Sequence, residues 1–223
     1  MNFNTFSFNP QINAGISRVG YDTPTQIQSR AIPPILEGSD VLGLAQTGTG
    51  KTAAFVLPML QHLMKGQRGK LRALILAPTR ELAEQTHVAI KELGGQTGLR
   101  SISIYGGVSA KPQKNRLRNG VDIVVACPGR LLDLKNQGAI DLRNIEILIL
   151  DEVLSVGDVA FQQKCHERML EFRENGTTTV LVSHSPDLIA SLCERALWLD
   201  KGKIVALGEA DMITQKYKTE MSV

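Results

Sequence analysis

Apolar runs alternate with amphipathic stretches along most of the chain. The runs predict strands near residues 40–44, 71–77, 101–105, 122–126, 145–150 and 177–182. The helical patterns cover residues 10–19, 55–63, 79–93, 110–119, 131–136, 161–174, 186–193 and 209–218, and residues 21–28 lead into a further helix that ends near Gly38. Several strands are apolar on both faces, which predicts an α/β fold with a mostly parallel sheet between two helical layers. Residues 196–207 predict a β-hairpin. The two prolines at 33 and 34 are expected to bend or interrupt the helix that ends near Gly38.

A glycine-rich stretch separates the first strand from the helix that follows it. It comprises Ala45, Gln46, Thr47, Gly48, Thr49, Gly50, Lys51 and Thr52. Such a turn directs several backbone N–H groups into one concavity at a helix N-terminus, where an anion is favoured. Lys51 can reach the terminal phosphates of a nucleotide, and the Thr52 hydroxyl can ligate Mg²⁺. Ala45 stands where the usual pattern begins with glycine. The alternative is a glycine-rich turn that binds nothing.

An acidic pair, Asp151-Glu152, ends the apolar strand near residues 145–150. One carboxylate of such a pair can hold Mg²⁺, usually through water, and the next can orient or deprotonate an attacking water. Ligands of parallel sheets bind beyond the carboxyl ends of the strands. The glycine-rich stretch and the acidic pair are both predicted to lie there, which together indicate a site for Mg·ATP. The alternative is a solvated acidic pair.

Composition narrows the class of protein. The chain has 223 residues, of which 43% are hydrophobic, 21% charged and 4% aromatic, as in an ordinary globular α/β domain. A net charge of +3 is too small to establish a polyanionic partner. The three cysteines have no metal-ligand spacing and predict reduced thiols. No apolar run reaches the roughly 18 residues of a membrane span. We expect one monomeric cytoplasmic domain, residues 1–223, without membrane insertion.

Residues 1–152 resemble the first RecA-like domain of a DEAD-box RNA helicase. The matching pieces, in order, are Phe3, Gly20-Tyr21, Pro24-Thr25, Ile27-Gln28, 45–52, 78–83, Gly106-Gly107, 128–130 and 150–152. The resemblance implies a P-loop NTPase fold in which Gln28 hydrogen-bonds the adenine edge, with Phe3 stacked on the ring and Tyr21 beside it. It also implies that single-stranded RNA meets a backbone-binding set of residues: Thr79, Arg80, Gly107, Gly129 and Arg130. Considered without the resemblance, Gln28 is a surface or capping residue.

The chain departs from this family after the acidic pair. Val153-Leu154 replaces the family's Ala-Asp, and Ser183-His184-Ser185 replaces its Ser-Ala-Thr. Three other segments carry a second resemblance: 150–158, Val182-Ser183-His184 and 198–204. From about Leu150 to residue 223 the chain resembles the C-terminal part of an ABC transporter ATPase of the polysaccharide-export kind. That resemblance implies a switch role for His184 at the γ-phosphate. The chain thus resembles an engineered chimera of two families, both of which are expected to carry the phosphate loop and the acidic pair on neighbouring strands.

These patterns leave three functional hypotheses open. The first is a P-loop domain that binds Mg·ATP and ADP, with weak or no hydrolysis and no unwinding. In it Lys51, Glu152 and His184 are catalytic, while Thr52 and Asp151 hold the metal. The second is the RNA-backbone-binding half of a DEAD-box helicase. The third is a designed fusion without a biological task, which is compatible with the first.

Overall fold

The computed structural model describes residues 2–39, 41–44, 49–151, 178–182, 186–200 and 203–221. Its helices are η1 (Phe3–Phe6), α1 (Pro10–Arg18), α2 (Gln26–Leu36), α3 (Lys51–Leu63), α4 (Arg80–Gly94), α5 (Ala110–Arg118), α6 (Pro128–Asn136), α8 (Pro186–Leu192) and α9 (Ala210–Met221). Its strands are β1 (Val41–Leu44), β2 (Ala73–Leu76), β3 (Ser101–Ile104), β4 (Ile123–Ala126), β5 (Ile147–Asp151), β6 (Thr178–Val182), β7 (Arg195–Asp200) and β8 (Lys203–Glu209). The helix predicted over 161–174 lies outside the described residues.

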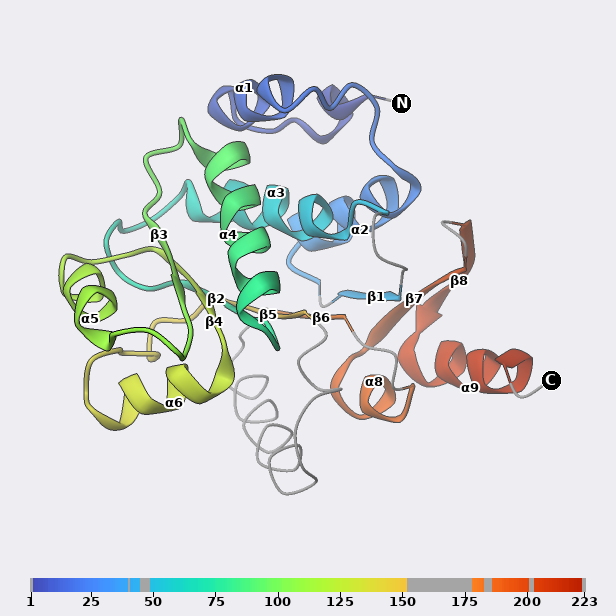
Figure 1. Cartoon of the computed structure of the whole chain (residues 1–223). Helices are drawn as coiled ribbons and strands as arrows, with labels where there is room; N and C mark the ends of the chain where they lie inside the picture. The colour runs from blue at the N-terminus through green and yellow to red at the C-terminus, as the bar shows by residue number, and fades with distance from the viewer. Residues whose placement is uncertain are drawn as a thin grey trace.

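The strands form one sheet in the order β3-β4-β2-β5-β6-β1-β7-β8 (Figure 1). Neighbouring strands are parallel except β7 and β8, which form the predicted antiparallel hairpin. The predicted α/β class is therefore confirmed. The expectation that the phosphate-loop strand and the acidic strand are neighbours is wrong, because β6 lies between β1 and β5. Strand β6 therefore lies between the strand that leads into the glycine-rich stretch and the strand that ends in Asp151.

Both faces of the sheet are covered, and alternate residues of each strand supply the two cores. Helices α1 to α4 lie on one side of the sheet, and α6, α8 and α9 lie on the other (Figure 1). In β5, Ile147 and Ile149 join the core under α1 to α4, whereas Leu148 and Leu150 join the core with α6, α8 and α9. This alternation follows from the two-residue period of a strand and explains the apolar runs in the sequence.

Helix α2 continues to Leu36 through Pro33 and Pro34, so the predicted interruption is wrong. Each proline removes a backbone donor, but only two residues follow them in the helix. Burial of Ile27, Ala31, Ile32 and Ile35 in the core under α1 to α4 offsets the lost bonds. Helix α6 begins at Pro128, three residues before the predicted start. Proline suits that first position because its fixed φ is already helical.

Helix α1 packs unusually closely on the end of α4. A Cβ atom added to Gly15 would lie 2.0 Å from the carbonyl oxygen of Leu93. A contact that short is impossible between real atoms, so the two backbones can approach only because residue 15 is glycine. Arg18, at the end of α1, donates to the carbonyl of Glu92 at 3.0 Å and closes the same contact.

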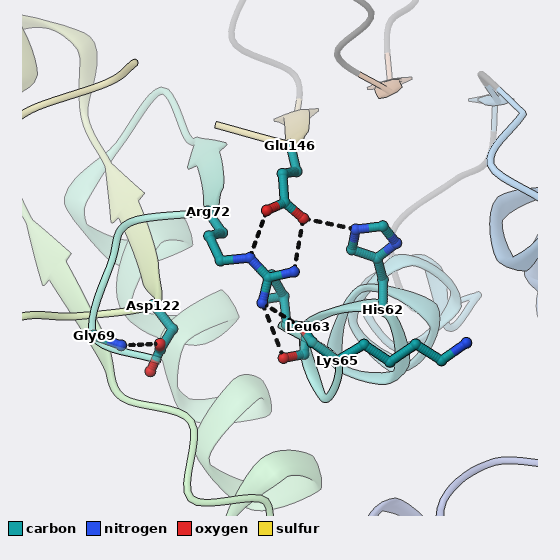
Figure 2. A network of polar contacts seen from close by, with 7 residues as sticks. All are labelled: His62, Leu63, Lys65, Gly69, Arg72, Asp122 and Glu146. Carbon is teal, nitrogen blue, oxygen red and sulfur yellow. Dashed lines mark hydrogen bonds and ion pairs between the residues drawn. The ribbon is translucent and has the colours of Figure 1, made fainter. Parts of the chain in front are cut away.

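A polar network ties the amino ends of three strands together (Figure 2). Arg72, just before β2, donates to both carboxylate oxygens of Glu146, just before β5, at 2.6 and 2.7 Å. Its Nη1 donates to the carbonyls of Leu63 and Lys65 at 3.2 and 2.7 Å, at the end of α3. His62 Nε2 lies 2.9 Å from Glu146 Oε2. The Arg72 hydrogen bonds hold the pKa of Glu146 below its ordinary value, and burial opposes that shift.

Asp122 makes a second connection at the same edge, just before β4. Its carboxylate is fully buried and accepts from the backbone N–H groups of Gly69 at 2.6 Å and Arg100 at 2.8 Å. The loops that precede β2 and β3 are thereby attached to β4. At the amino edge of the sheet, the charged side chains of Arg72, Glu146 and Asp122 have hydrogen-bond partners and stabilise the fold. The candidate site lies at the opposite edge.

Candidate nucleotide and nucleic-acid site

The described part of the phosphate loop ends in a left-handed glycine at the start of α3. Gly50 has φ +92°, and a Cβ atom there would lie 2.6 Å from Gln28 Nε2. Lys51 and Thr52 follow as the first residues of α3, and both are partly exposed. No side chain caps this helix at Gly50, whereas α1, α2, α4 and α5 each have a side-chain cap. The N–H groups of the first turn of α3 therefore suit an anion.

The acidic end of β5 lies at the same edge of the sheet. Asp151 is the last residue of β5, is 4% exposed, and stands in register with Val182 of β6. Since β5, β6 and β1 are parallel, their carboxyl ends meet at one edge. The predicted site residues Thr47, Gly48, Glu152 and His184 lie outside the described residues, so their roles remain predictions.

Gln28 connects α2 to the phosphate loop. Its Oε1 accepts from the Thr25 N–H at 2.9 Å, and its Nε2 donates to the Gly50 carbonyl at 3.2 Å. The Thr25 hydroxyl accepts in return from the Gln28 N–H, which completes a capping box. Gln28 is only 3% exposed, so the surface alternative is wrong and the capping alternative is confirmed. Its predicted hydrogen bonds to adenine remain a prediction.

Phe3 and Tyr21 stack on each other beside this connection. Their ring centroids are 6.3 Å apart and the planes are inclined by 19°. Phe3 is 4% exposed, and Phe6 meets it edge-on, whereas Tyr21 is 42% exposed. Tyr21 is therefore the ring that a base can reach in this structure, with Phe3 behind it. The predicted stacking of Phe3 on adenine would require Phe3 to leave that position.

The residues predicted to meet RNA gather at the carboxyl ends of β2, β3 and β4. Thr79 caps α4 by accepting from the Leu82 N–H at 3.3 Å, and Arg80 is the first, exposed residue of that helix. Gly107 follows β3, and Gly129 lies in the first turn of α6, after β4. Helix α6, like α3, has no side-chain cap. Parallel strands bring these separate loops to one edge of the sheet.

Three glycines at this edge face open space. Gly106, Gly107 and Gly129 are exposed, and no described atom lies within 4 Å of a Cβ atom placed on any of them. Gly107 has φ +75°, which alone favours glycine, but no such constraint acts on Gly106 or Gly129. Packing inside the chain does not explain glycine at those two positions. Glycine there would leave room for a ligand to approach the backbone closely.

Arg130 contacts the protein's own backbone, and its contact with RNA stays a prediction. Its Nη2 donates to the Val108 carbonyl at 2.9 Å, and its side chain is 11% exposed. The guanidinium thus attaches the loop after β3 to the start of α6. Its Nη1 is buried and has no hydrogen-bond partner within the described residues. An acceptor that reached this atom would be favoured, because an unsatisfied buried donor is costly.

Sequence reasoning missed two residues beside Arg80. The Arg80 guanidinium carbon lies 4.7 Å from the centroid of the Tyr105 ring, and Glu84 lies one helical turn after Arg80. A signal was available for both. Tyr105 directly precedes the Gly106-Gly107 pair, and Arg80 and Glu84 are four residues apart on one helix face.

None of the described helices is long and apolar enough to cross a membrane. No group of three or more potential metal-ligating His, Cys, Asp or Glu side chains occurs within the described ranges. Within those ranges, Thr52 and Asp151 are the residues predicted to hold a metal.

Comparison with known proteins finds helicases. The family model for DEAD/DEAH box helicases matches residues 25–189. The probable ATP-dependent RNA helicase DDX43 of Homo sapiens is 37% identical over 213 residues, which are 93% of this chain and 32% of that protein. The DEAD-box ATP-dependent RNA helicase CshA of Streptococcus pneumoniae is 40% identical over 189 residues, 85% of this chain and 36% of that protein. The chain spans about a third of the length of these relatives.

Solved structures agree with the sequence matches. A DEAD box protein from Methanococcus jannaschii superposes with a TM-score of 0.73 at 35% identity, covering 83% of this chain and 50% of that one. A hypothetical ATP-dependent RNA helicase from Sulfolobus tokodaii gives 0.72 at 35% identity, covering 83% and 55%. The predicted resemblance of residues 153–223 to ABC transporter ATPases gains no support here, because the helicase model extends through residue 189.

Proposed function

Because this chain belongs to the DEAD/DEAH box helicase family, we propose that it is a helicase RecA-like domain that binds Mg·ATP and the backbone of single-stranded RNA. The observation that carries the proposal is the shared sheet edge. The uncapped start of α3, the buried Asp151, the open glycines and the uncapped start of α6 all lie beyond the carboxyl ends of parallel strands.

In the nucleotide half, the N–H groups of α3 and the Lys51 ammonium hold the phosphates, while Thr52 and Asp151 hold Mg²⁺. The donors fit this cofactor, since hydroxyl and carboxylate oxygens are the ligands Mg²⁺ prefers. Bound Mg²⁺ supplies charge neutralisation at the phosphate oxygens. Glu152 positions water, and His184 meets the γ-phosphate. Tyr21, with Phe3 behind it, covers one face of the base, and Gln28 turns its amide from Gly50 to the adenine edge.

Calorimetric titration with Mg·ATP tests this half. Lys51→Ala removes a charge at the phosphates and should weaken binding about 100-fold, equivalent to about 2.7 kcal/mol. Lys70→Ala is the matched control, because Lys70 is an exposed lysine of the loop before β2, at the other edge. Equal affinities for the Lys51→Ala and Lys70→Ala variants would contradict the proposal.

In the RNA half, Arg80, the Thr79 hydroxyl and the N–H groups near Gly107 and Gly129 bind phosphates and sugars. Such contacts position a strand without reading its bases. Fluorescence anisotropy with single-stranded RNA at low salt tests this half. Arg80→Ala should weaken binding and lower the slope of log affinity against log salt by about 0.7, as expected for one lost phosphate contact on a single strand. Arg143→Ala, at an exposed arginine near the amino edge, is the charge-matched control.

A finer proposal concerns residues 153–223. We propose that this segment is of ABC-ATPase origin and that ATP hydrolysis is weak or absent, because Val153-Leu154 lacks the polar groups that link the nucleotide and RNA sites in the family. The support is the sequence pattern from Leu150 to Asp158 and at His184. Steady-state ATP turnover that RNA strongly stimulates in the unaltered chain would contradict it.

A further inference from the structure

We propose that Tyr105 is a positioning residue for RNA binding, which holds the Arg80 guanidinium at the RNA-facing edge. The inference rests on the proposed RNA contact of Arg80 and names what prepares that contact. Arg80 is exposed at the start of α4, and its guanidinium carbon lies 4.7 Å from the Tyr105 ring centroid. A guanidinium at that distance is attracted to the negative face of the ring.

Two hydrogen bonds hold Tyr105, and a third holds its partner Glu84. The Tyr105 hydroxyl hydrogen-bonds to Glu84, one turn along α4 from Arg80. The Tyr105 carbonyl accepts from Gln113 Nε2 of α5 at 3.2 Å. Glu84 also accepts from the Ser103 hydroxyl of β3 at 2.7 Å. The ring therefore cannot drift with the exposed loop that begins at Gly106, although it lies directly before that loop.

The charges around the ring are consistent with this role. The Ser103 hydrogen bond lowers the pKa of Glu84, so that carboxylate is ionised at neutral pH. The Glu84 hydrogen bond raises the pKa of Tyr105, so that hydroxyl is protonated and can donate. A neutral ring held by an ionised carboxylate keeps its attractive face toward Arg80. Glu84, which is ionised, also lies one helical turn after Arg80 and attracts its positive charge.

Preorganisation explains why such a device would matter. An exposed arginine loses rotamer freedom when it grips a phosphate, and a side chain already held loses less. The guanidinium carbon lies over the ring, and the Arg80 side chain also hydrogen-bonds the Tyr105 side chain. A guanidinium has five N–H donors, so others remain available for a phosphate. Tyr105 thus acts through Arg80 and needs no contact with RNA of its own.

A double-mutant cycle on RNA affinity tests the proposal. In the unaltered chain, Tyr105→Leu should weaken binding of single-stranded RNA about two- to fivefold, the range of an exposed cation–π contact. In the Arg80→Ala background the same substitution should have no effect, because nothing remains to be positioned. Tyr105→Phe keeps the ring and should restore most of the affinity, which a variant that merely misfolds the loop would not do. Thermal melts of each variant establish that the domain is folded.

Three outcomes would overturn the inference. An equal loss in both backgrounds would show that Tyr105 contacts RNA directly, as would a loss that depends on base identity. No loss on Tyr105→Leu, with Arg80→Ala still impaired, would show that Arg80 needs no positioning. Absence of RNA binding by the unaltered chain at low salt would instead refute the proposed RNA function. The failures of the two proposals are therefore distinguishable.

Discussion

The two edges of the sheet use polar residues in opposite ways. At the amino edge, Arg72 donates short hydrogen bonds to Glu146, and Asp122 accepts one from the loop before β2. Glycine at position 15 permits a close contact between α1 and α4. At the carboxyl edge, two helices start without side-chain caps, three glycines face open space, and Arg130 keeps a buried N–H group without a described partner. At the amino edge, hydrogen-bonded groups stabilise the fold. At the carboxyl edge, a bound ligand would satisfy the groups that have no described partner. Substitutions should therefore change stability at one edge and binding at the other.

Glu146→Ala should have the largest effect on stability. It leaves the Arg72 guanidinium, itself 8% exposed, without its carboxylate, and breaking such a pair costs on the order of 3 kcal/mol. Urea unfolding measures the change. Asp141→Ala breaks a pair whose side chains are 49% and 88% exposed and should change stability little. A similar loss for both variants would mean that burial does not distinguish the two pairs.

Gly15→Ala should come next, at about 2 kcal/mol, because the added methyl group must separate α1 from α4. Thermal unfolding measures it. Ser17→Ala, on an exposed position of the same helix, controls for helix propensity. RNA and ATP affinity of the folded Gly15→Ala variant should be unchanged, since the contact lies at the amino edge. A loss of RNA affinity in the Gly15→Ala variant would contradict the assignment of stability to the amino edge and binding to the carboxyl edge.

Gly129→Ala should act in the opposite direction. Alanine favours the helical start of α6 and meets no described atom, so stability should rise by up to about 1 kcal/mol. RNA affinity should fall about tenfold, because the methyl group occupies the space that the RNA backbone would enter. Asn136→Ala, exposed near the end of α6, should leave RNA affinity unchanged. Destabilisation together with unchanged RNA affinity would contradict the assignment of this edge.

The smallest expected effect is a pH dependence of the amino edge. The Arg72 hydrogen bonds lower the pKa of Glu146 below 4.5 in the folded chain, so the unfolded chain binds a proton first as pH falls. The stabilisation is therefore complete above about pH 4.5 and is lost as pH falls through the lowered pKa. Urea unfolding between pH 6 and pH 3 should show a steeper decline in the unaltered chain than in a Glu146→Gln variant. Equal declines in the stability of the two proteins would show that Glu146 is not the source of the pH dependence.

Periodicity made much of the fold predictable. The β5 run was predicted as apolar on both faces because residues 147–150 are all apolar. The order of the strands was not predictable in this way. The position of β6 between β1 and β5 depends on pairing between segments far apart in sequence, which no local pattern encodes. Helix α2 runs through Pro33 and Pro34 because tertiary burial outweighed a local preference.

The site was predictable where chemistry follows from residue type. Lys51, Thr52 and Asp151 were identified from a motif and a strand end, and the structure brings their elements to one edge. Gln28 and Arg130 were not predictable in the same way. Their side chains bind carbonyls of Gly50 and Val108, and a backbone acceptor leaves no trace in the sequence. Tyr105 was missed although it directly precedes the Gly106-Gly107 pair, because its contact with Arg80 joins two elements that are separate in the sequence.

The place of β1 between β6 and β7 has a consequence for how the protein is made. Val41 pairs with Val180 and Gly43 with Leu197, so both neighbours of β1 are synthesised long after β1 itself. A nascent chain that has not reached these residues has no sheet to anchor the strand that leads into the glycine-rich stretch. Strand β1 can therefore take its place in the sheet only after β6 and β7 have left the ribosome.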